Sequence, residues 1–202
     1  MWRIRNRWPV KARAVFEPST ANVIDGFNQL GHFTCGTGAM NWFRRKNHLQ
    51  QDWQAWQYAG TDARQQVDWI KDQLGAYPEQ PFFAFINFGE THFPYRLDGQ
   101  MGLEDEAEAR SLRGRATIDE KQDHGFDEAM WRLQVTATEF LDERMGELLA
   151  FFAEIGRYVT VVMCADHGEC FGEQGFYGHG FFHTKVLEVP MAIFNFDPNA
   201  AR

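Results

Sequence analysis

The stretch YVTVVMCADHGECFGEQGFYGHG, residues 158–180, joins an apolar run to a group of acidic and imidazole side chains. The run over 158–165 has the length and the composition of a strand that is buried on both faces. Asp166 and His167 follow the run directly. Because sites in α/β sheets lie just beyond the carboxyl ends of strands, the stretch predicts an α/β fold with chemistry at this strand end.

The rest of the chain alternates apolar runs with segments of helical periodicity. The predicted elements are strands over 32–36, 82–88 and 189–194 and helices over 19–31, 61–74 and 127–152. A glycine turn is expected at 36–38, and the polar stretch 103–125 is predicted to be an excursion over the surface. Strands separated by helices predict an α/β/α layered domain with a mostly parallel sheet covered on both faces.

Length and charge limit the classes of protein. A chain of 202 residues suits one well-buried domain, placed here at 19–202 behind a basic arm at 1–18. The net charge of −8 argues against a body that binds nucleic acid. The arm, with five Arg and Lys residues, suits either a nucleic-acid or membrane contact or a solvated segment, and we favour the solvated segment.

The composition also bears on location and on partners. No segment has the apolar length of a membrane span or of a secretory signal, so we expect a cytoplasmic protein without a membrane span. Cys35, Cys164 and Cys170 show no CxxC spacing, which favours reduced thiols over a disulfide framework. Seven Trp and nineteen Phe predict either a large core or surfaces that a partner buries.

Asp166 and His167 are candidate metal ligands. A carboxylate and an imidazole at a strand end reach one cation if the backbone bends, which Gly168 permits. Mixed oxygen and nitrogen donors suit Zn²⁺ or Mn²⁺ better than Ca²⁺. The alternative is that the pair forms a simple turn with a surface imidazole, because an isolated Asp-His pair is more often found in such a turn than at a metal site.

Two further histidines strengthen the metal hypothesis. His179 lies between two glycines, in a segment too rich in glycine for a core helix, so its ring is expected to project into open space. His92 follows the predicted strand 82–88, at a second strand end. Packing alone requires no such grouping, and the three histidines together favour a functional site.

These residues resemble a known family. ADHGECFGEQGFYGHG followed by EVPMAIF is similar to the C-terminal signature of the sulfatase branch of the alkaline phosphatase superfamily. PFFAFINFGETHFPY and LDERMGELLAFF resemble the strand and the helix that precede it there. The motifs keep the family's order over roughly residues 80 to 195. The resemblance implies an alkaline-phosphatase-like α/β domain, and the chain looks like its C-terminal part, incomplete on the N-terminal side.

The resemblance also implies roles for single residues. Asp166 and His167 match metal ligands, while His179 and His92 match histidines that contact the transferred group or a second ion and serve in catalysis. Glu169 matches a position that we expect to orient a ligand. His183 and Lys185 are weaker candidates for substrate binding, and Cys164 and Cys170 are expected to pack in the core.

The family's nucleophile is the part that the sequence does not show. A sulfatase nucleophile would be a Cys or Ser two residues before a Pro and four before an Arg, and no such stretch occurs. The nearest candidates, Thr34, Cys35 and Thr37, lie in a region that resembles a later strand of the family.

The sequence therefore predicts a metal-dependent hydrolase domain for a small sulfate or phosphate ester that is inactive or incomplete alone. Its expected partners are an N-terminal half or a second copy. The alternative is a catalytically dead α/β module with a binding or assembly role.

Overall fold

The computed structural model describes residues 22–44, 49–97, 100–101 and 125–200. The helices are α1 (Val23–Gln29), α2 (Ala63–Gly75), α4 (Glu128–Glu154) and α5 (Thr184–Leu187), with single 3-10 turns at Asn41–Phe43 and Glu173–Gly175. The strands are β1 (Phe33–Gly38), β2 (Ala55–Tyr58), β3 (Phe82–Asn87), β4 (Arg96–Leu97), β5 (Gln100–Met101), β6 (Val159–Cys164), β7 (Cys170–Phe171), β8 (Tyr177–Gly178) and β9 (Met191–Phe196). The basic arm 1–18 and the excursion over 103–124 lie outside the described residues.

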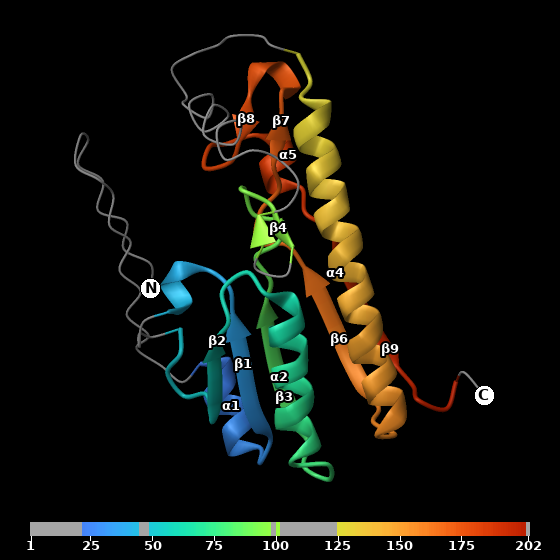
Figure 1. The fold of residues 1–202 in the computed structure, drawn as a ribbon. Coiled ribbons are helices and arrows are strands. Elements are labelled where there is room, and N and C mark those ends of the chain that lie inside the picture. Colours follow the sequence, from blue (N-terminus) through green and yellow to red (C-terminus); the bar gives the residue numbers. More distant parts are fainter. Residues whose placement is uncertain (1–21, 45–48, 98–99, 102–124, 201–202) are drawn as a thin grey trace, which may run out of the picture.

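The strands form two main sheets. β1 lies at the centre of a parallel sheet with the order β2-β1-β3, and its Cys35 is paired with Ala55 on one side and Ala84 on the other. β6 and β9 form a separate antiparallel pair. The arrowheads of β1, β3 and β6 point to the same end of the molecule (Figure 1). The α/β class is therefore confirmed. The sequence predicted a mostly parallel sheet, and the last strand, β9, is antiparallel to β6.

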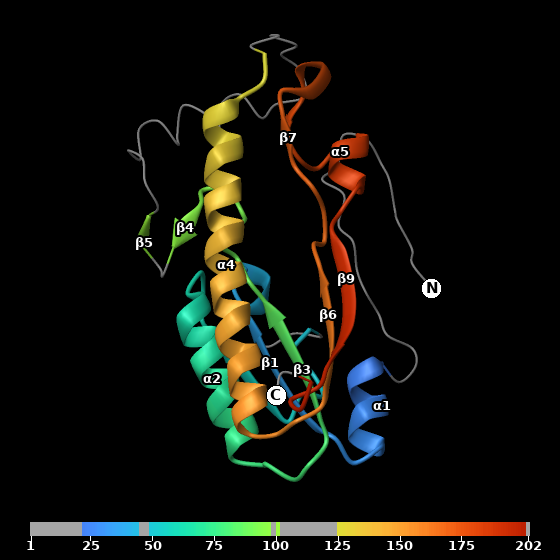
Figure 2. The ribbon, with the colours of Figure 1, turned by 90° about the vertical axis from the view of Figure 1, so that its right-hand side faces the viewer.

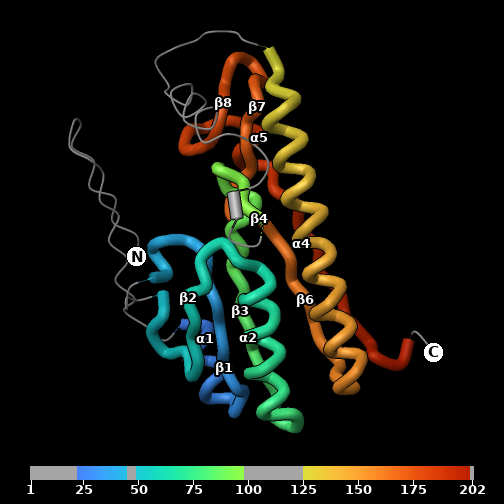
Figure 3. Tube along the Cα trace, viewed as in Figure 1, coloured from blue at the N-terminus to red at the C-terminus, as the bar shows by residue number. Residues whose placement is uncertain are grey.

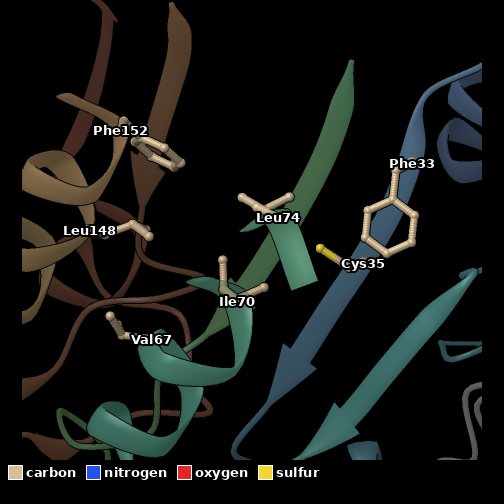
Figure 4. Close-up of a cluster of buried hydrophobic side chains, with 7 residues drawn as sticks. All are labelled: Phe33, Cys35, Val67, Ile70, Leu74, Leu148 and Phe152. Atoms are coloured by element: carbon tan, nitrogen blue, oxygen red, sulfur yellow. The ribbon is translucent and has the colours of Figure 1, made fainter. Parts of the chain in front are cut away.

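One apolar core joins the parallel sheet to the two long helices. Val67, Ile70 and Leu74 of α2 lie between β1 and α4, whose Leu148 and Phe152 face them (Figure 4). Val159 of β6 and Phe196 of β9 pack against the same cluster, as do apolar residues of β3. The antiparallel pair is therefore attached to the parallel sheet through α4 and the shared core.

The two long helices begin where the sequence predicts. The Asp62 carboxylate accepts the Gln65 amide at the start of α2, and the Asp127 carboxylate accepts the Met130 amide at the start of α4. The side chain of Asn22 caps the first helix, which lies inside the predicted range 19–31. Residues 19–21 of that range lie outside the described residues.

The predicted glycine turn at 36–38 is wrong. β1 continues through these residues and is buried at every position. A Cβ on Gly36 would lie 2.5 Å from the Trp56 ring, and one on Gly38 would lie 2.5 Å from the Phe43 ring. The glycines therefore serve to admit aromatic rings against the strand rather than to turn it.

Helices cover the parallel sheet on both faces, as predicted. α2 packs on one face, and α1 lies on the other, where the Phe27 ring stacks on Phe83 at 4.3 Å (Figure 2). β2 was not expected from its sequence, which mixes polar and aromatic residues. No helix among the described residues is long and apolar enough to cross a membrane.

Candidate metal centre

Three histidines from separate segments meet beyond the carboxyl ends of β3 and β6. The His167 and His179 rings stack with their centroids 4.1 Å apart, and the His92 ring lies 5.6 Å from that of His179. His92 follows β3, whereas His167 follows β6 and His179 follows β8. The trace leaves β3 and β6 at the same end of the sheets (Figure 3). The structure thus brings together the three histidines that the sequence singled out.

His167 has a free ring nitrogen that faces a carboxylate. Its Nδ1 lies 3.0 Å from the Gly168 carbonyl oxygen, which can only accept, so Nδ1 carries the proton and Nε2 keeps its lone pair. Asp166 Oδ1 lies 3.9 Å from Nε2. Two donors on one tetrahedral zinc ion are about 3.4 Å apart, so a small side-chain movement lets Asp166 and His167 share an ion.

Glu169 is tied to His179. Its Oε2 lies 2.7 Å from His179 Nδ1; Glu169 is partly buried, whereas His179 is exposed. Donor atoms of His167, Glu169 and His179 lie within 4.8 Å of one another. A carboxylate in this position orients an imidazole and leaves its Nε2 free, which is the role expected for Glu169, and the spacing also suits direct ligation.

Gly168 fixes the backbone between Asp166 and Glu169. Its amide donates to the Val186 carbonyl at 2.8 Å. A Cβ at this position would lie 2.0 Å from the Lys185 carbonyl oxygen, which is backbone and cannot swing aside. The close approach of α5 to this loop therefore requires a glycine.

His92 occupies a half-buried position beside the cluster. Burial lowers the pKa of His92, and the neighbouring His179 lowers this pKa further, while the Phe93 backbone and Glu169 act in the opposite direction. The neutral form is therefore favoured near pH 7, which leaves a ring lone pair available to a ligand or a proton.

The structure places the two weaker substrate-binding candidates differently. His183 is buried, and its Nδ1 accepts the Lys185 amide at 3.1 Å and lies 3.1 Å from Cys170 Sγ. The Lys185 side chain is half exposed and lies 4.0 Å from Glu188. His183 thus holds the start of α5, and its contact with a substrate stays a prediction, as does that of Lys185.

The candidate nucleophiles of this chain are buried in the core. Thr34, Cys35 and Thr37 lie on β1 with no exposed surface, and burial raises the pKa of Cys35 to about 12. Burial, with nearby carboxylates, raises the pKa of Cys170 to about 11, which fits its expected packing role. Cys164 is exposed at the end of β6, so its predicted place in the core is wrong.

Glu90 is a buried residue that the sequence reasoning missed. Its side chain is fully buried, and its two carboxylate oxygens accept the amides of Ala63 at 2.7 Å and Gly89 at 3.0 Å. It therefore ties the first turn of α2 to the loop that carries His92. The available signal was an acidic residue two positions after the apolar run 82–88.

We expect Glu90→Gln to change how stability depends on pH. Burial raises the pKa of Glu90, so its contribution to the free energy of unfolding is present below the ordinary carboxyl pKa and is lost as pH rises through the folded-state value. Glutamine does not titrate. The stability of the wild type relative to Glu90→Gln should therefore fall as pH rises above the ordinary carboxyl pKa, measured by urea unfolding. A constant difference would contradict the assignment.

The fold resembles that of solved phosphoethanolamine transferase domains. The C-terminal periplasmic domain of the transferase EptC from Campylobacter jejuni aligns with a TM-score of 0.64 and 15% identity, over 92% of this chain and 59% of that one. The EptC domain from Escherichia coli in complex with Zn aligns with a TM-score of 0.66 and 14% identity, over 91% and 54%. No protein-family model and no curated protein matches the sequence.

At this identity the comparisons bear on the fold. The neighbours share the mixed α/β architecture of this chain, so the fold class expected from the sequence is confirmed. This chain spans between 54 and 59% of the length of the neighbours. Membership of the sulfatase family stays a prediction. So does the cytoplasmic location, and the neighbours are periplasmic domains by name.

Proposed function

We propose that this chain is the metal-binding part of a metal-dependent enzyme of the alkaline phosphatase superfamily that acts on a phosphate or sulfate ester. The observation that carries the proposal is the convergence of His167, Glu169 and His179, whose donor atoms lie within 4.8 Å of one another. A solved neighbour holds Zn and is named a phosphoethanolamine transferase, which favours zinc as the ion and a phosphate ester as the substrate.

Each residue of the site has a role that follows from its side-chain chemistry. Asp166 and His167 would hold the ion, since they present an oxygen and a free imidazole nitrogen at one strand end. Glu169 orients His179, whose Nε2 then faces the ion or the oxyanion of the ester. His92, in its neutral form, accepts a hydrogen bond or a proton at the same edge. Held by these residues, a zinc ion would supply Lewis-acid polarisation of the ester oxygen.

The proposal is tested by metal uptake. Titration of the purified full chain with Zn²⁺ and with Mn²⁺ in a calorimeter should show saturable binding of one ion to each chain. Absence of uptake of both metals would overturn the proposal.

We expect negligible turnover of aryl phosphate and aryl sulfate esters by this chain alone. Of the candidate nucleophiles among the described residues, Thr34, Cys35 and Thr37 are fully buried, and the pKa of Cys35 is raised to about 12. A chromogenic assay with zinc present should therefore stay at the rate of the buffer. Robust turnover that His167→Ala abolishes would show that a nucleophile is available within the chain.

An assembly module without catalysis is the second candidate. The observation in its favour is the outward face of the antiparallel pair, where Val162, Met191 and Ile193 are each more than half exposed. Metal uptake separates the two candidates, because an assembly module has no need of an ion at Asp166 and His167.

A further inference from the structure

A buried cysteine and a buried histidine meet beside the loop over 166–169 that carries the candidate metal ligands. Cys170 is 2% exposed and His183 is 8% exposed, and Cys170 Sγ lies 3.1 Å from His183 Nδ1. The amide of Lys185 also donates to this nitrogen, at 3.1 Å. Nδ1 therefore keeps its lone pair, so the Cys170 thiol is the donor of the contact and the imidazole carries its proton on Nε2.

This geometry differs from that of the thiolate–imidazolium pair that activates a catalytic cysteine. Such a pair needs a proton on Nδ1, and that proton would face the N–H group of Lys185. Aromatic rings also enclose the imidazole, because the ring centroids of Phe176 and Phe181 lie 5.4 and 6.5 Å from that of His183. The pair of Cys170 and His183 is therefore a fixed internal contact rather than a reactive group.

α5 holds the segment over 168–170 at two points. The Gly168 amide donates to the Val186 carbonyl at 2.8 Å, and a Cβ on Gly168 would lie against the Lys185 carbonyl. Two residues later, the side chain of Cys170 contacts His183, which is the N-cap of α5. Residues 168 and 170 therefore both face α5.

The residue between these two attachments faces the other way. The Glu169 carboxylate lies 2.7 Å from His179 Nδ1, and donor atoms of Glu169, His167 and His179 lie within 4.8 Å of one another. Side chains along an extended segment alternate between opposite sides. Holding residues 168 and 170 against α5 therefore turns the residue between them toward the histidines.

We propose that Cys170 and His183 are positioning residues of the candidate metal centre. Their buried contact holds the segment over 168–170 against α5 and so directs the Glu169 carboxylate to Nδ1 of His179. The bond from Nδ1 to the carboxylate fixes the ring proton of His179 and leaves its Nε2 with a lone pair. The use of that lone pair for an ion or an ester rests on the proposed function, whereas the direction of Glu169 does not.

The tautomer of the His179 ring in the metal-free full chain tests the proposal. Nitrogen-15 spectra distinguish ring nitrogens that carry a proton from those that do not, at a pH above the ordinary pKa of an imidazole. We expect the wild type to carry the proton on Nδ1, because the Glu169 carboxylate only accepts. Cys170→Ala and His183→Ala should each lose this tautomer as the major form.

Two conservative variants should keep the wild-type tautomer. Cys170→Ser retains a donor toward His183 Nδ1. His183→Asn places an amide oxygen as many bonds from the backbone as Nδ1, so it can accept from both Cys170 and Lys185. It also removes the buried Nε2–H group, which has no hydrogen-bond partner among the described residues.

Val67→Ala is the control for a general loss of stability. Val67 is fully buried in the core on α2, so its truncation should lower the free energy of unfolding. The tautomer of His179 should be that of the wild type in this variant, because the contact between Cys170 and His183 is intact.

Zinc affinity, measured by competition with a chelator, separates this inference from the proposed function. Cys170→Ala and His183→Ala should each bind zinc about 10-fold more weakly than the wild type. The double variant should lose no more than either single variant, because both changes remove the same contact. A wild type that binds no metal would overturn the proposed function, and the tautomer of His179 would still decide whether the pair directs Glu169.

Two results would overturn the proposal. One is a His179 ring that keeps its Nδ1 proton in both alanine variants, because the backbone alone would then direct Glu169. The other is loss of that tautomer in Val67→Ala as well, because any loosening of the fold would then be enough to turn Glu169 away.

Discussion

Replacing Asp166 or His167 with alanine should lower the affinity of the chain for Zn²⁺ by more than about 100-fold, since loss of a mere orienting partner already costs 10- to 100-fold. His167 offers a lone pair at Nε2 because its Nδ1 donates to the Gly168 carbonyl, and Asp166 Oδ1 lies 3.9 Å from that nitrogen. Glu169→Gln should have the smaller effect of about 10-fold if the carboxylate orients His179. Competition with a chromophoric chelator measures each affinity.

A nearby acidic residue supplies the control for this series. Glu188 lies at the end of α5 with a side chain that is 72% exposed and 4.0 Å from Lys185, so Glu188→Gln removes one negative charge without touching the cluster. Its zinc affinity should equal that of the wild type. If Asp166→Ala and His167→Ala also bind like the wild type, the ion is held elsewhere. A loss with Glu169→Gln as large as that with His167→Ala would make Glu169 a direct ligand.

The sequence predicted the parts of the fold that depend on local pattern. Both long helices carry a capping aspartate ahead of an apolar stripe, and both begin close to the predicted starts, behind the caps Asp62 and Asp127. The strands that end before His92 and before Asp166 are continuous apolar runs and were found for that reason. Pattern within a segment is enough to predict such elements.

Features that depend on partners distant in the sequence were not predictable. The glycines of β1 suggested a turn because their neighbours, the rings of Trp56 and Phe43, could not be known from local spacing. The direction of β9 is set by pairing with β6 along its whole length, which an apolar run does not encode. Nothing in the sequence near Glu90 indicates that its carboxylate accepts the amide of Ala63 at the start of α2.

The sequence singled out the residues of the candidate site but could not predict the contacts between them. The strand ends placed His92 and His167 at one edge, because parallel strands end together. The bond between Glu169 and His179 depends on the path of the loop over 170–178, which contains four residues with positive φ: Gly172, Gln174, Gly175 and Gly178. Such a path cannot be derived from composition, and the distances between donor atoms therefore came from the structure alone.

Gly168→Ala should destabilise the chain by about 2 to 3 kcal/mol and should also weaken zinc binding. The added Cβ would lie 2.0 Å from the Lys185 carbonyl oxygen and 3.0 Å from that of Glu188, so either the loop or α5 must move. The bond from the Gly168 amide to the Val186 carbonyl would be lost as they separate. Asp166, His167 and Glu169 all adjoin this bend, so the site should loosen with it. Urea unfolding and zinc titration of the same protein measure both effects.

Gly146→Ala is the matched control, because it adds the same methyl group at an exposed position inside α4 with no atom within 4 Å of the new Cβ. Alanine loses less backbone entropy than glycine in a helix, so this variant should gain about 0.5 to 1 kcal/mol and bind zinc normally. If Gly→Ala lowers the free energy of unfolding at position 168 and raises it at position 146, the destabilisation at position 168 comes from the close approach of α5. A Gly168→Ala protein as stable as the wild type would mean that the loop and α5 are not packed as described, and the orientation of Asp166 and His167 would then need another cause.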